Sequence, residues 1–130
     1  GGARFGLAFD DYGNRFLCNI RNPVQHVVLP LEYLARQPLL PVRAVLNDAA
    51  PAGDTLPVYR ISPTETWRAV RAKRFVLEPG QTNPRSETTP DGYFTSSSGI
   101  TIYRGSAYPE EVRGNAFVGE VAANAIHRQR

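Results

Sequence analysis

Residues 99–130, G-I-T-I-Y-R-G-S-A-Y-P-E-E-V-R-G-N-A-F-V-G-E-V-A-A-N-A-I-H-R-Q-R, are the stretch that decides the fold. The stretch contains a strand-like run at 100–103, a polar insert, and two further short apolar runs at 116–121 and 125–127. Short apolar runs bounded by turn residues are typical of β-strands. The stretch therefore predicts three consecutive antiparallel strands.

The same pattern occurs near the start of the chain. Gly13 and Gly114 begin matching Gly-Asn pairs that lie 101 residues apart (114 − 13 = 101), and His26 and His127 keep this spacing. The spacing stays constant from Gly13 to His26 in one copy and from Gly114 to His127 in the other, which indicates two copies of one structural unit. The matched segments are 6–9 with 99–102, 13–19 with 114–120, and His26 with His127.

Length and composition favour short strands over long helices. The chain has 130 residues, enough for one domain. We expect it to be part of a larger domain, because the sequence opens inside a strand pattern and contains no Met. Hydrophobic residues make up 42% of the chain, and Gly (11) and Pro (11) are frequent, as in proteins rich in turns.

The first copy predicts a meander of three strands over residues 4–30. Phe5, Leu7 and Phe9 alternate with small residues, which predicts that these three lie on a buried face. In the second strand, Phe16 and Cys18 are expected on one face, with Cys18 buried. The predicted segments are strands at 5–9, 15–19 and 24–29, with reversals at 10–14 and 20–23.

The segment between the copies predicts a proline-rich surface insertion. A helical turn is expected at 31–36, and the prolines that follow exclude a long helix. Ser62-Pro63-Thr64-Glu65 resembles the start of a helix. Residues 66–77 fit either a helix or a strand, and their alternation favours a strand. The insertion also contains a predicted short strand at 58–61 and a predicted exposed polar loop at 78–91.

These patterns predict an all-β fold, a fragment of a β-propeller. About two blades of antiparallel meander strands are expected, separated by a long looped insertion. In the second copy an insert at 104–114 replaces the tight turn, and 108–111 predicts a local turn or a single helical turn within it. The predicted divisions are a blade-like segment at 4–30, the insertion at 31–92, and a blade-like segment at 93–130.

Charge and cysteine content exclude several classes of protein. The net charge of +3 comes from scattered arginines, apart from one basic group at 68–74, so we expect no nucleic-acid partner. No apolar run approaches the roughly 18 residues of a membrane span. Cys18 is the single cysteine, which excludes an internal disulfide, a CxxC zinc site and a CxxCH haem site in this segment.

The repeat also predicts where a functional site lies. In a propeller, corresponding loops of all blades lie on one face, so loops 20–23 and 122–124 are expected together. Arginine binds anions through paired hydrogen bonds and histidine titrates near neutral pH, which suits an anionic cofactor and proton transfer. The candidates are His26 as catalytic residue, Arg21, Asn22, Gln25, His127 and Arg128 as cofactor-binding residues, and Glu120 and Asn124 beside them.

Each candidate also has a structural interpretation. Repeated positions are often scaffold, so His26 and His127 are also consistent with hydrogen bonds between sheets, and for His127 the structural interpretation is favoured. Asp10 and Asp11 stand in a turn that contains Gly13, where aspartate commonly forms the turn itself. The two glutamates at 110–111, which follow a proline, are expected to be exposed to solvent.

Four segments resemble the membrane-bound dehydrogenase family of planctomycete-type bacteria. They are F-G-L-A-F-D-D-Y-G-N-R-F (5–16), Q-H-V-V-L-P (25–30), V-Y-R-I-S-P-T-E-T-W-R (58–68) and G-I-T-I-Y-R-G-S-A-Y-P-E-E-V-R-G-N-A-F-V-G-E-V (99–121). Within the last segment, Y-R-G-S-A-Y-P-E-E-V-R-G-N-A-F-V (103–118) is similar to sorbosone and aldose dehydrogenases.

The resemblance implies an oxidoreductase propeller, periplasmic or on the cell surface, that oxidises a sugar or polyol. It implies pyrroloquinoline quinone with calcium as cofactors, and a c-type haem domain outside this segment as electron acceptor. A histidine would take the hydroxyl proton while the quinone accepts hydride. The alternative is a non-catalytic propeller that binds carbohydrate or protein. An enzyme should focus His26 and an arginine on one pocket, whereas a binding module should present a wide polar or aromatic surface.

Overall fold

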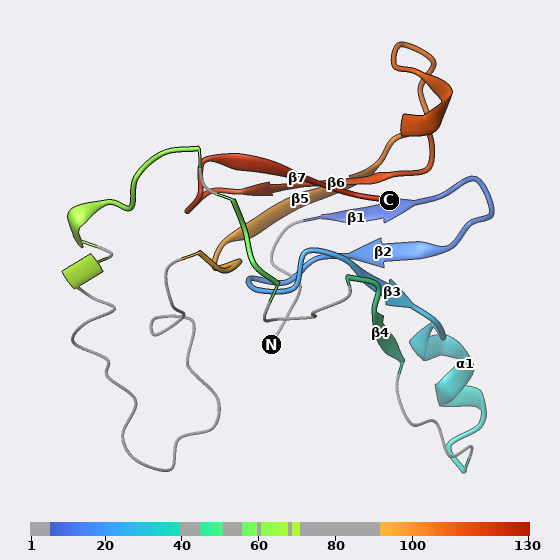
Figure 1. Cartoon of the computed structure of the whole chain (residues 1–130). Coiled ribbons are helices and arrows are strands. Elements are labelled where there is room, and N and C mark those ends of the chain that lie inside the picture. Colours follow the sequence, from blue (N-terminus) through green and yellow to red (C-terminus); the bar gives the residue numbers. More distant parts are fainter. Residues whose placement is uncertain (1–5, 40–44, 51–55, 60, 68, 71–91) are drawn as a thin grey trace.

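Two antiparallel β-sheets packed face to face form most of the described structure (Figure 1). The computed structural model describes residues 6–39, 45–50, 56–59, 61–67, 69–70 and 92–130. One sheet has the order β1-β2-β3-β4 and the other the order β5-β6-β7, which confirms the all-β prediction. The elements are β1 (Leu7–Phe9), β2 (Arg15–Leu17), β3 (Gln25–Val27), α1 (Leu31–Arg36), β4 (Leu46–Asp48), β5 (Ser97–Ile102), the 3-10 helix η3 (Glu110–Val112), β6 (Ala116–Glu120) and β7 (Ala125–Gln129).

Strand register decides which side chains face the other sheet. Directly opposed residues of an antiparallel pair lie on the same face. In the first sheet Ala8 is opposite Phe16, and Phe16 is opposite His26. In the second sheet Val118 is opposite His127. Ala8 and Val118 both belong to the core, so these two rows are the surfaces that meet.

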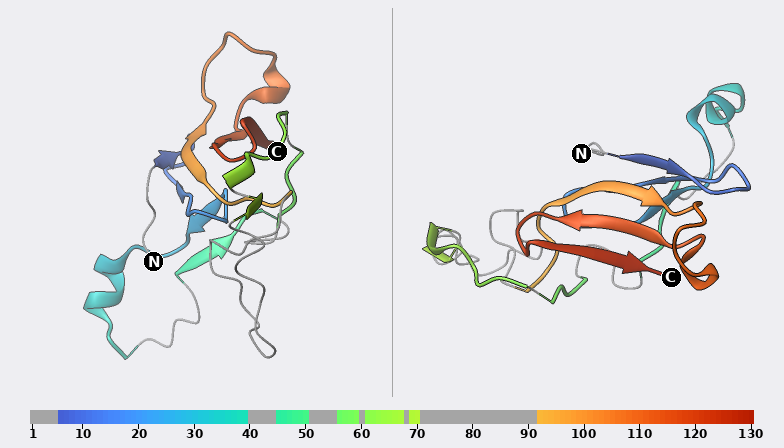
Figure 2. Two further views of the ribbon diagram at one scale, coloured as in Figure 1. Left: turned by 90° about the vertical axis from the view of Figure 1, so that its left-hand side faces the viewer. Right: turned by 90° about the horizontal axis from the view of Figure 1, so that it is seen from above.

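A small apolar core lies between the sheets, and the two views in Figure 2 show the second sheet beside β1 and β2. Its buried members are Ala8, Cys18, Val24, Ile100, Ile102, Ala116 and Val118, with Phe16 packed against them. Burial raises the pKa of the Cys18 thiol, and the backbone of Ile100 and Gly99 partly opposes this effect. Cys18 is therefore a small core residue, as expected from the repeat.

Close contact between the sheets requires a glycine at the start of β1. Gly6 has a φ of 121°, and a Cβ on this residue would lie 2.6 Å from the backbone nitrogen of Ile100. An L-residue there would meet both an unfavourable backbone conformation and a steric clash. Gly13 and Gly114, the matched glycines of the two copies, also share a positive φ, of 82° and 79°. The repeat in sequence is thus also a repeat in backbone conformation.

The prediction that Leu7 and Phe9 lie on the buried face of the first strand is wrong. Leu7 and Phe9 are 57% and 43% exposed, whereas Ala8 between them is buried. The reason is the close approach of β1 to β5, which leaves room only for a small side chain between them. Alternation alone identified the strand but not which of its faces the second sheet covers.

The insertion departs from prediction in three places. Leu46–Asp48 forms the edge strand β4, paired with β3, where a surface excursion was expected. Described residues of 58–61 form no strand; an isolated bridge joins Pro57 to Tyr93, and proline offers no N–H to extend the pairing. Residues 66–67 and 69–70 are helical rather than extended, because the start signals at 62–65 prevail.

Several other expectations are confirmed, and some lie outside the described residues. The helical turn α1 occurs where predicted, and the single turn η3 overlaps the predicted segment 108–111, beginning and ending slightly later in the chain. Residues 4–5, 71–77 and 78–91, and all four basic residues of the group at 68–74, lie outside the described residues. In the part of the chain that is described, no helix is long and apolar enough to cross a membrane.

Substitution of Gly6 tests the close approach between the sheets. We expect Gly6→Ala to lower the free energy of unfolding by at least about 2 kcal/mol, because the added methyl group meets the backbone of Ile100. Gly13→Ala is the matched control, since its added Cβ meets nothing within 4 Å and pays only the backbone cost, about 1 kcal/mol. Urea denaturation measures both. Equal losses for the two variants would contradict this explanation.

Candidate functional site

The hairpin loops that follow β2 and β6 lie at one end of the stacked sheets. Asn19 shapes the first loop, since its Oδ1 accepts hydrogen bonds from the backbone N–H groups of Arg21 and Asn22 at 3.0 and 2.8 Å. The backbone N–H of Ser97 donates to Ile20 at 2.9 Å, which joins this loop to the second sheet. The loop after β6 contacts the residues just before β5 as well, because the backbone N–H of Val121 donates to the carbonyl oxygen of Ser96.

The polar candidate residues in and beside the first loop differ in their contacts. Asn22 is buried, and its Oδ1 has no hydrogen-bond partner among the described residues. Gln25 is bound on both sides: its Oε1 accepts from Asn19 at 3.0 Å, and its Nε2 donates to Asp48 at 2.8 Å. Gln25 is opposite Leu17, so it lies on the sheet face that points away from the second sheet. Arg21 is half-buried in the loop.

The two histidines occupy different surroundings despite their equal spacing in sequence. His26 stacks on Phe16, with ring centroids 5.1 Å apart and an interplanar angle of 25°. His127 meets the buried Phe94 edge-on at 5.1 Å, and its Nε2 lies 3.3 Å from Oε1 of Gln129. The difference arises from strand register. His26 is opposite Phe16, but the residue opposite Phe117 is Arg128 rather than His127.

Arg128 lies toward the opposite end of the sheet from the two hairpin loops. Its Nε donates to Oδ1 of Asn115 at 3.1 Å, and its Nη2 donates to the carbonyl oxygen of Glu111 at 3.1 Å. These bonds tie β7 to the insert between β5 and β6. The structure therefore separates Arg128 from Arg21 and Asn22.

Glu120 is the most deeply buried charged side chain in the described part of the chain, 1% exposed. Its carboxylate accepts hydrogen bonds from the backbone N–H groups of Thr95, Ser96 and Ala122, and from the Thr95 hydroxyl. Burial raises the pKa of this carboxyl group, and the N–H donors partly offset that effect. The carboxylate fastens the start of β5 to the turn after β6, a structural role.

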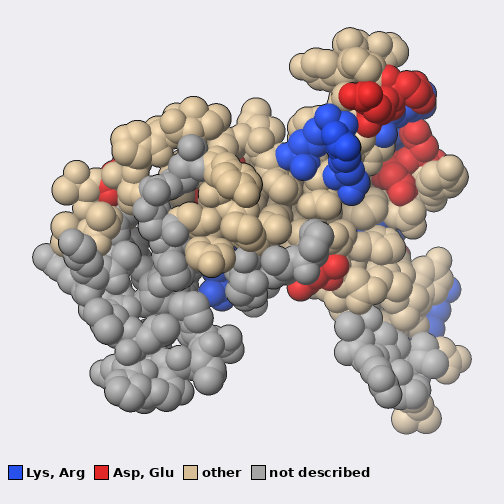
Figure 3. All heavy atoms as spheres, in the orientation of Figure 1, with Lys and Arg blue, Asp and Glu red and all other residues tan. Residues whose placement is uncertain are grey.

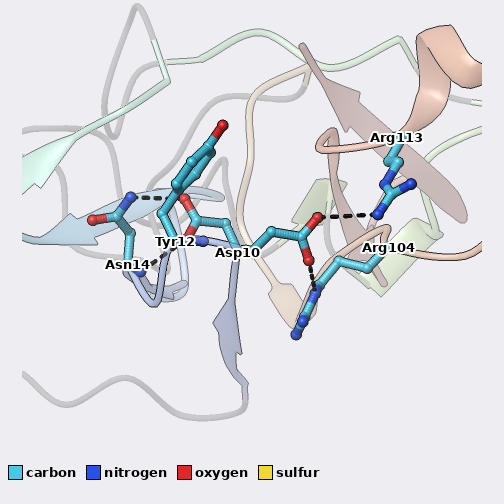
Figure 4. Close-up of polar contacts among 6 residues, drawn as sticks. Asp10, Tyr12, Asn14, Arg104 and Arg113 are labelled. Carbon is cyan, nitrogen blue, oxygen red and sulfur yellow. Dashed lines mark hydrogen bonds and ion pairs between the residues drawn. The ribbon is translucent and has the colours of Figure 1, made fainter.

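A charged cluster that the sequence did not predict joins the β1–β2 turn to the insert (Figure 4). Asp11 Oδ1 lies 2.6 Å from Nε of Arg104, and Asp11 Oδ2 lies 3.3 Å from Nη2 of Arg113. The hydrogen bond from Arg104 lowers the pKa of Asp11. The neighbouring Asp10 instead forms the turn, accepting bonds from the backbone of Tyr12 and Asn14.

We call Asp11, Arg104, Arg113, Tyr12 and Tyr108 the turn–insert surface. The rings of Tyr12 and Tyr108 are 92% and 63% exposed. Figure 3 shows side chains of both charges gathered over this region, at the upper right. The signal in the sequence was the repeat itself: the β1–β2 turn and the insert are corresponding connections, so stacking the sheets brings them side by side.

The residues predicted to bind a quinone do not converge. Gln25 points away from the second sheet, Arg128 bonds to the insert, and His127 packs against Phe94. Within the described ranges, no group of three or more His, Cys, Asp or Glu side chains is placed to hold a metal ion. Binding of a quinone by these side chains therefore stays a prediction.

Comparison with known families bears on the whole chain. A family model described as a domain of unknown function, DUF7133, matches residues 1–130. The chain belongs to this family. Searches among curated proteins and among solved structures found no match. The match includes both sheets and the turn–insert surface, and the family description names no activity.

The pH dependence of stability tests the burial of Glu120. Because its pKa is raised, the native state binds the proton more tightly than the unfolded state does. Stability should therefore fall as pH rises from the ordinary glutamate value through the raised one. We expect the free energy of unfolding of the wild type, relative to Glu120→Gln, to decrease as pH rises above about 4.5, the ordinary pKa of a glutamate side chain. Denaturation at a series of pH values measures this, and a difference that grows with pH would contradict it.

Proposed function

We propose that this chain is part of a propeller oxidoreductase that acts on sugars or polyols, and that its described residues supply scaffold rather than reacting groups. The observation that supports the architecture is the repeat. Two antiparallel sheets with the same turn glycines, 101 residues apart (114 − 13 = 101), stack face to face as adjacent blades do. The resemblance to membrane-bound and sorbosone-type dehydrogenases supports the reaction class and a periplasmic or cell-surface location.

The scaffold role rests on the contacts of the candidate residues. His26 stacks on Phe16 within the first sheet, Gln25 bonds to Asn19 and Asp48, and Arg128 bonds to the insert. Each of these contacts stabilises a loop or a strand pair. When bound, pyrroloquinoline quinone would supply the hydride-accepting group, and a c-type haem domain would receive the electrons.

Quinone uptake by the natural polypeptide that carries this sequence tests the reaction class. Pyrroloquinoline quinone is titrated calorimetrically in the presence of calcium ions, and dye reduction is followed with a panel of sugars and polyols. We expect saturable uptake and substrate-dependent reduction. Absence of quinone binding would exclude this oxidoreductase class.

One substitution distinguishes a structural role of His26 from a catalytic one. His26→Phe keeps an aromatic ring to stack on Phe16 but cannot transfer a proton. We expect turnover to remain within about threefold of wild type, because the stacking contact is what the sheet requires. A fall of about a hundredfold or more with quinone uptake unchanged would instead make His26 the catalytic base. His26→Ala, which removes the stacking, is the control for stability.

The turn–insert surface favours a second candidate function, binding of carbohydrate without catalysis. Exposed aromatic rings beside paired charged groups suit sugar rings, which combine apolar faces with hydroxyl groups. We expect Tyr12→Ala and Tyr108→Ala each to weaken oligosaccharide binding about fivefold in calorimetric titration. Tyr59→Ala is the matched control, because Tyr59 is 93% exposed but lies in the insertion. An equal effect of all three variants would contradict a specific surface.

A further inference from the structure

Two polar side-chain atoms are buried at the end of the sheets where the hairpin loops lie, and neither has a hydrogen-bond partner among the described residues. They are Oδ1 of Asn22, in the loop after β2, and Oγ of Ser97, the first residue of β5. Asn22 is 2% and Ser97 6% exposed. An unpaired buried polar atom destabilises a fold, so such atoms nearly always bind a protein group or an ordered water molecule.

The backbone already joins the two residues that carry these atoms. The N–H of Ser97 donates to the carbonyl oxygen of Ile20 at 2.9 Å, and Asn22 is only two residues after Ile20. The loop is held compact, because the N–H of Asn19 donates to the carbonyl oxygen of Asn22 at 3.0 Å. The Ile20 carbonyl oxygen has a second lone pair with which to accept. Three polar groups therefore meet where the loop contacts β5, and a buried water molecule typically binds about three.

The second copy of the repeat shows that the fold itself does not require an amide at this position. Asn22 corresponds to Ala123 (123 − 22 = 101), which is 1% exposed. Both positions are buried, yet the alanine side chain has no polar atom to satisfy. The amide of Asn22 is therefore a feature of the first loop alone, and it needs a partner that the second loop does not.

The residues that shape the two loops also differ in reach. Glu120 accepts hydrogen bonds from the backbone of Ser96, so its carboxylate links the loop after β6 to the residues before β5. Its counterpart Asn19 (120 − 19 = 101) is shorter by one methylene group. In the described part of the chain, the Asn19 side chain bonds to residues of its own hairpin, among them Asn22 and Gln25. It does not link the first loop to the second sheet.

We propose that one ordered water molecule lies between the loop after β2 and the start of β5, donating a hydrogen bond to Oδ1 of Asn22 and bonding to Oγ of Ser97. This water links the first loop to the second sheet, as the carboxylate of Glu120 links the second loop. Both atoms are already shielded from solvent, so a further blade packed against this chain from outside does not reach them. A bridging water satisfies both atoms at once.

A crystal structure of the natural polypeptide that carries this sequence tests the site directly. We expect electron density for one water molecule within about 3.2 Å of both Oδ1 of Asn22 and Oγ of Ser97. Separate partners for the two atoms would overturn the proposal, and so would density for no water at either atom.

Hydrogen exchange of the same polypeptide, followed by mass spectrometry over residues 19–22, tests whether the water holds the loop. Asn22→Ala, which introduces the residue of the second copy, and Ser97→Ala should each speed exchange about tenfold, because each removes a partner of the water. The double variant should exchange no faster than the quicker single variant, since both side chains act through one water molecule.

Ser98→Ala is the matched control for these variants. Ser98 follows Ser97 on β5 and is only half-buried, so the same substitution there should leave exchange of the loop unchanged. An increase of about a hundredfold in the double variant, the product of two independent effects, would overturn a shared water. Unchanged exchange in both single variants would also overturn the proposal.

Discussion

The packing of Ala8 and Phe16 on Ile100 and Val118 is the contact on which the rest of the structure depends. The first sheet has only short strands, and a sheet of this size cannot bury enough apolar surface alone. Stacking supplies that burial, and it requires the β1 backbone to approach β5 so closely that residue 6 must be glycine. The exposure of Leu7 and the burial of Ala8 both follow from this approach.

Stacking also explains how the polar side chains are used. Once the sheets are fixed, their connections must be held at both ends, and backbone groups there need partners. Asn19 and Glu120 satisfy them at the hairpin end, and Asn115 and Arg128 do so at the insert end. The side-chain pair of Asp11 with Arg104 also joins the two connections at the insert end. The contacts of Gln25, His26 and Arg128 within the sheets and with the insert support the proposed scaffold role.

The order of stacking gives the two sheets different surroundings despite their matching sequences. Phe16 and Phe117 occupy equivalent strand positions, and both side chains point in the same direction along the stack of sheets. In the first sheet this direction leads to the second sheet, whereas in the second sheet it leads away from the first. His26 and His127 lose this equivalence, because the residue opposite Phe16 is a histidine whereas the residue opposite Phe117 is an arginine. A change of one residue in register moves a side chain to the other face of a sheet.

The sequence by itself determined the strands, the turns and their repetition. Gly13 and Gly114 require positive φ, and alternating apolar runs require extended backbone, so these features are local and can be predicted from neighbouring residues. It did not determine the edge strand β4, whose three exposed residues carry no apolar pattern, nor the helical conformation of residues 66–67 and 69–70, where a short run fits both periods.

Only the tertiary structure decided which face of β1 is buried, where the two histidines point, and that Asp11 meets Arg104 from 93 residues away. The physical reason is that burial, register across a hairpin and ion pairing between distant turns depend on how two sheets pack. A periodic pattern states that a strand has two faces, but only a neighbouring surface makes one of them the interior.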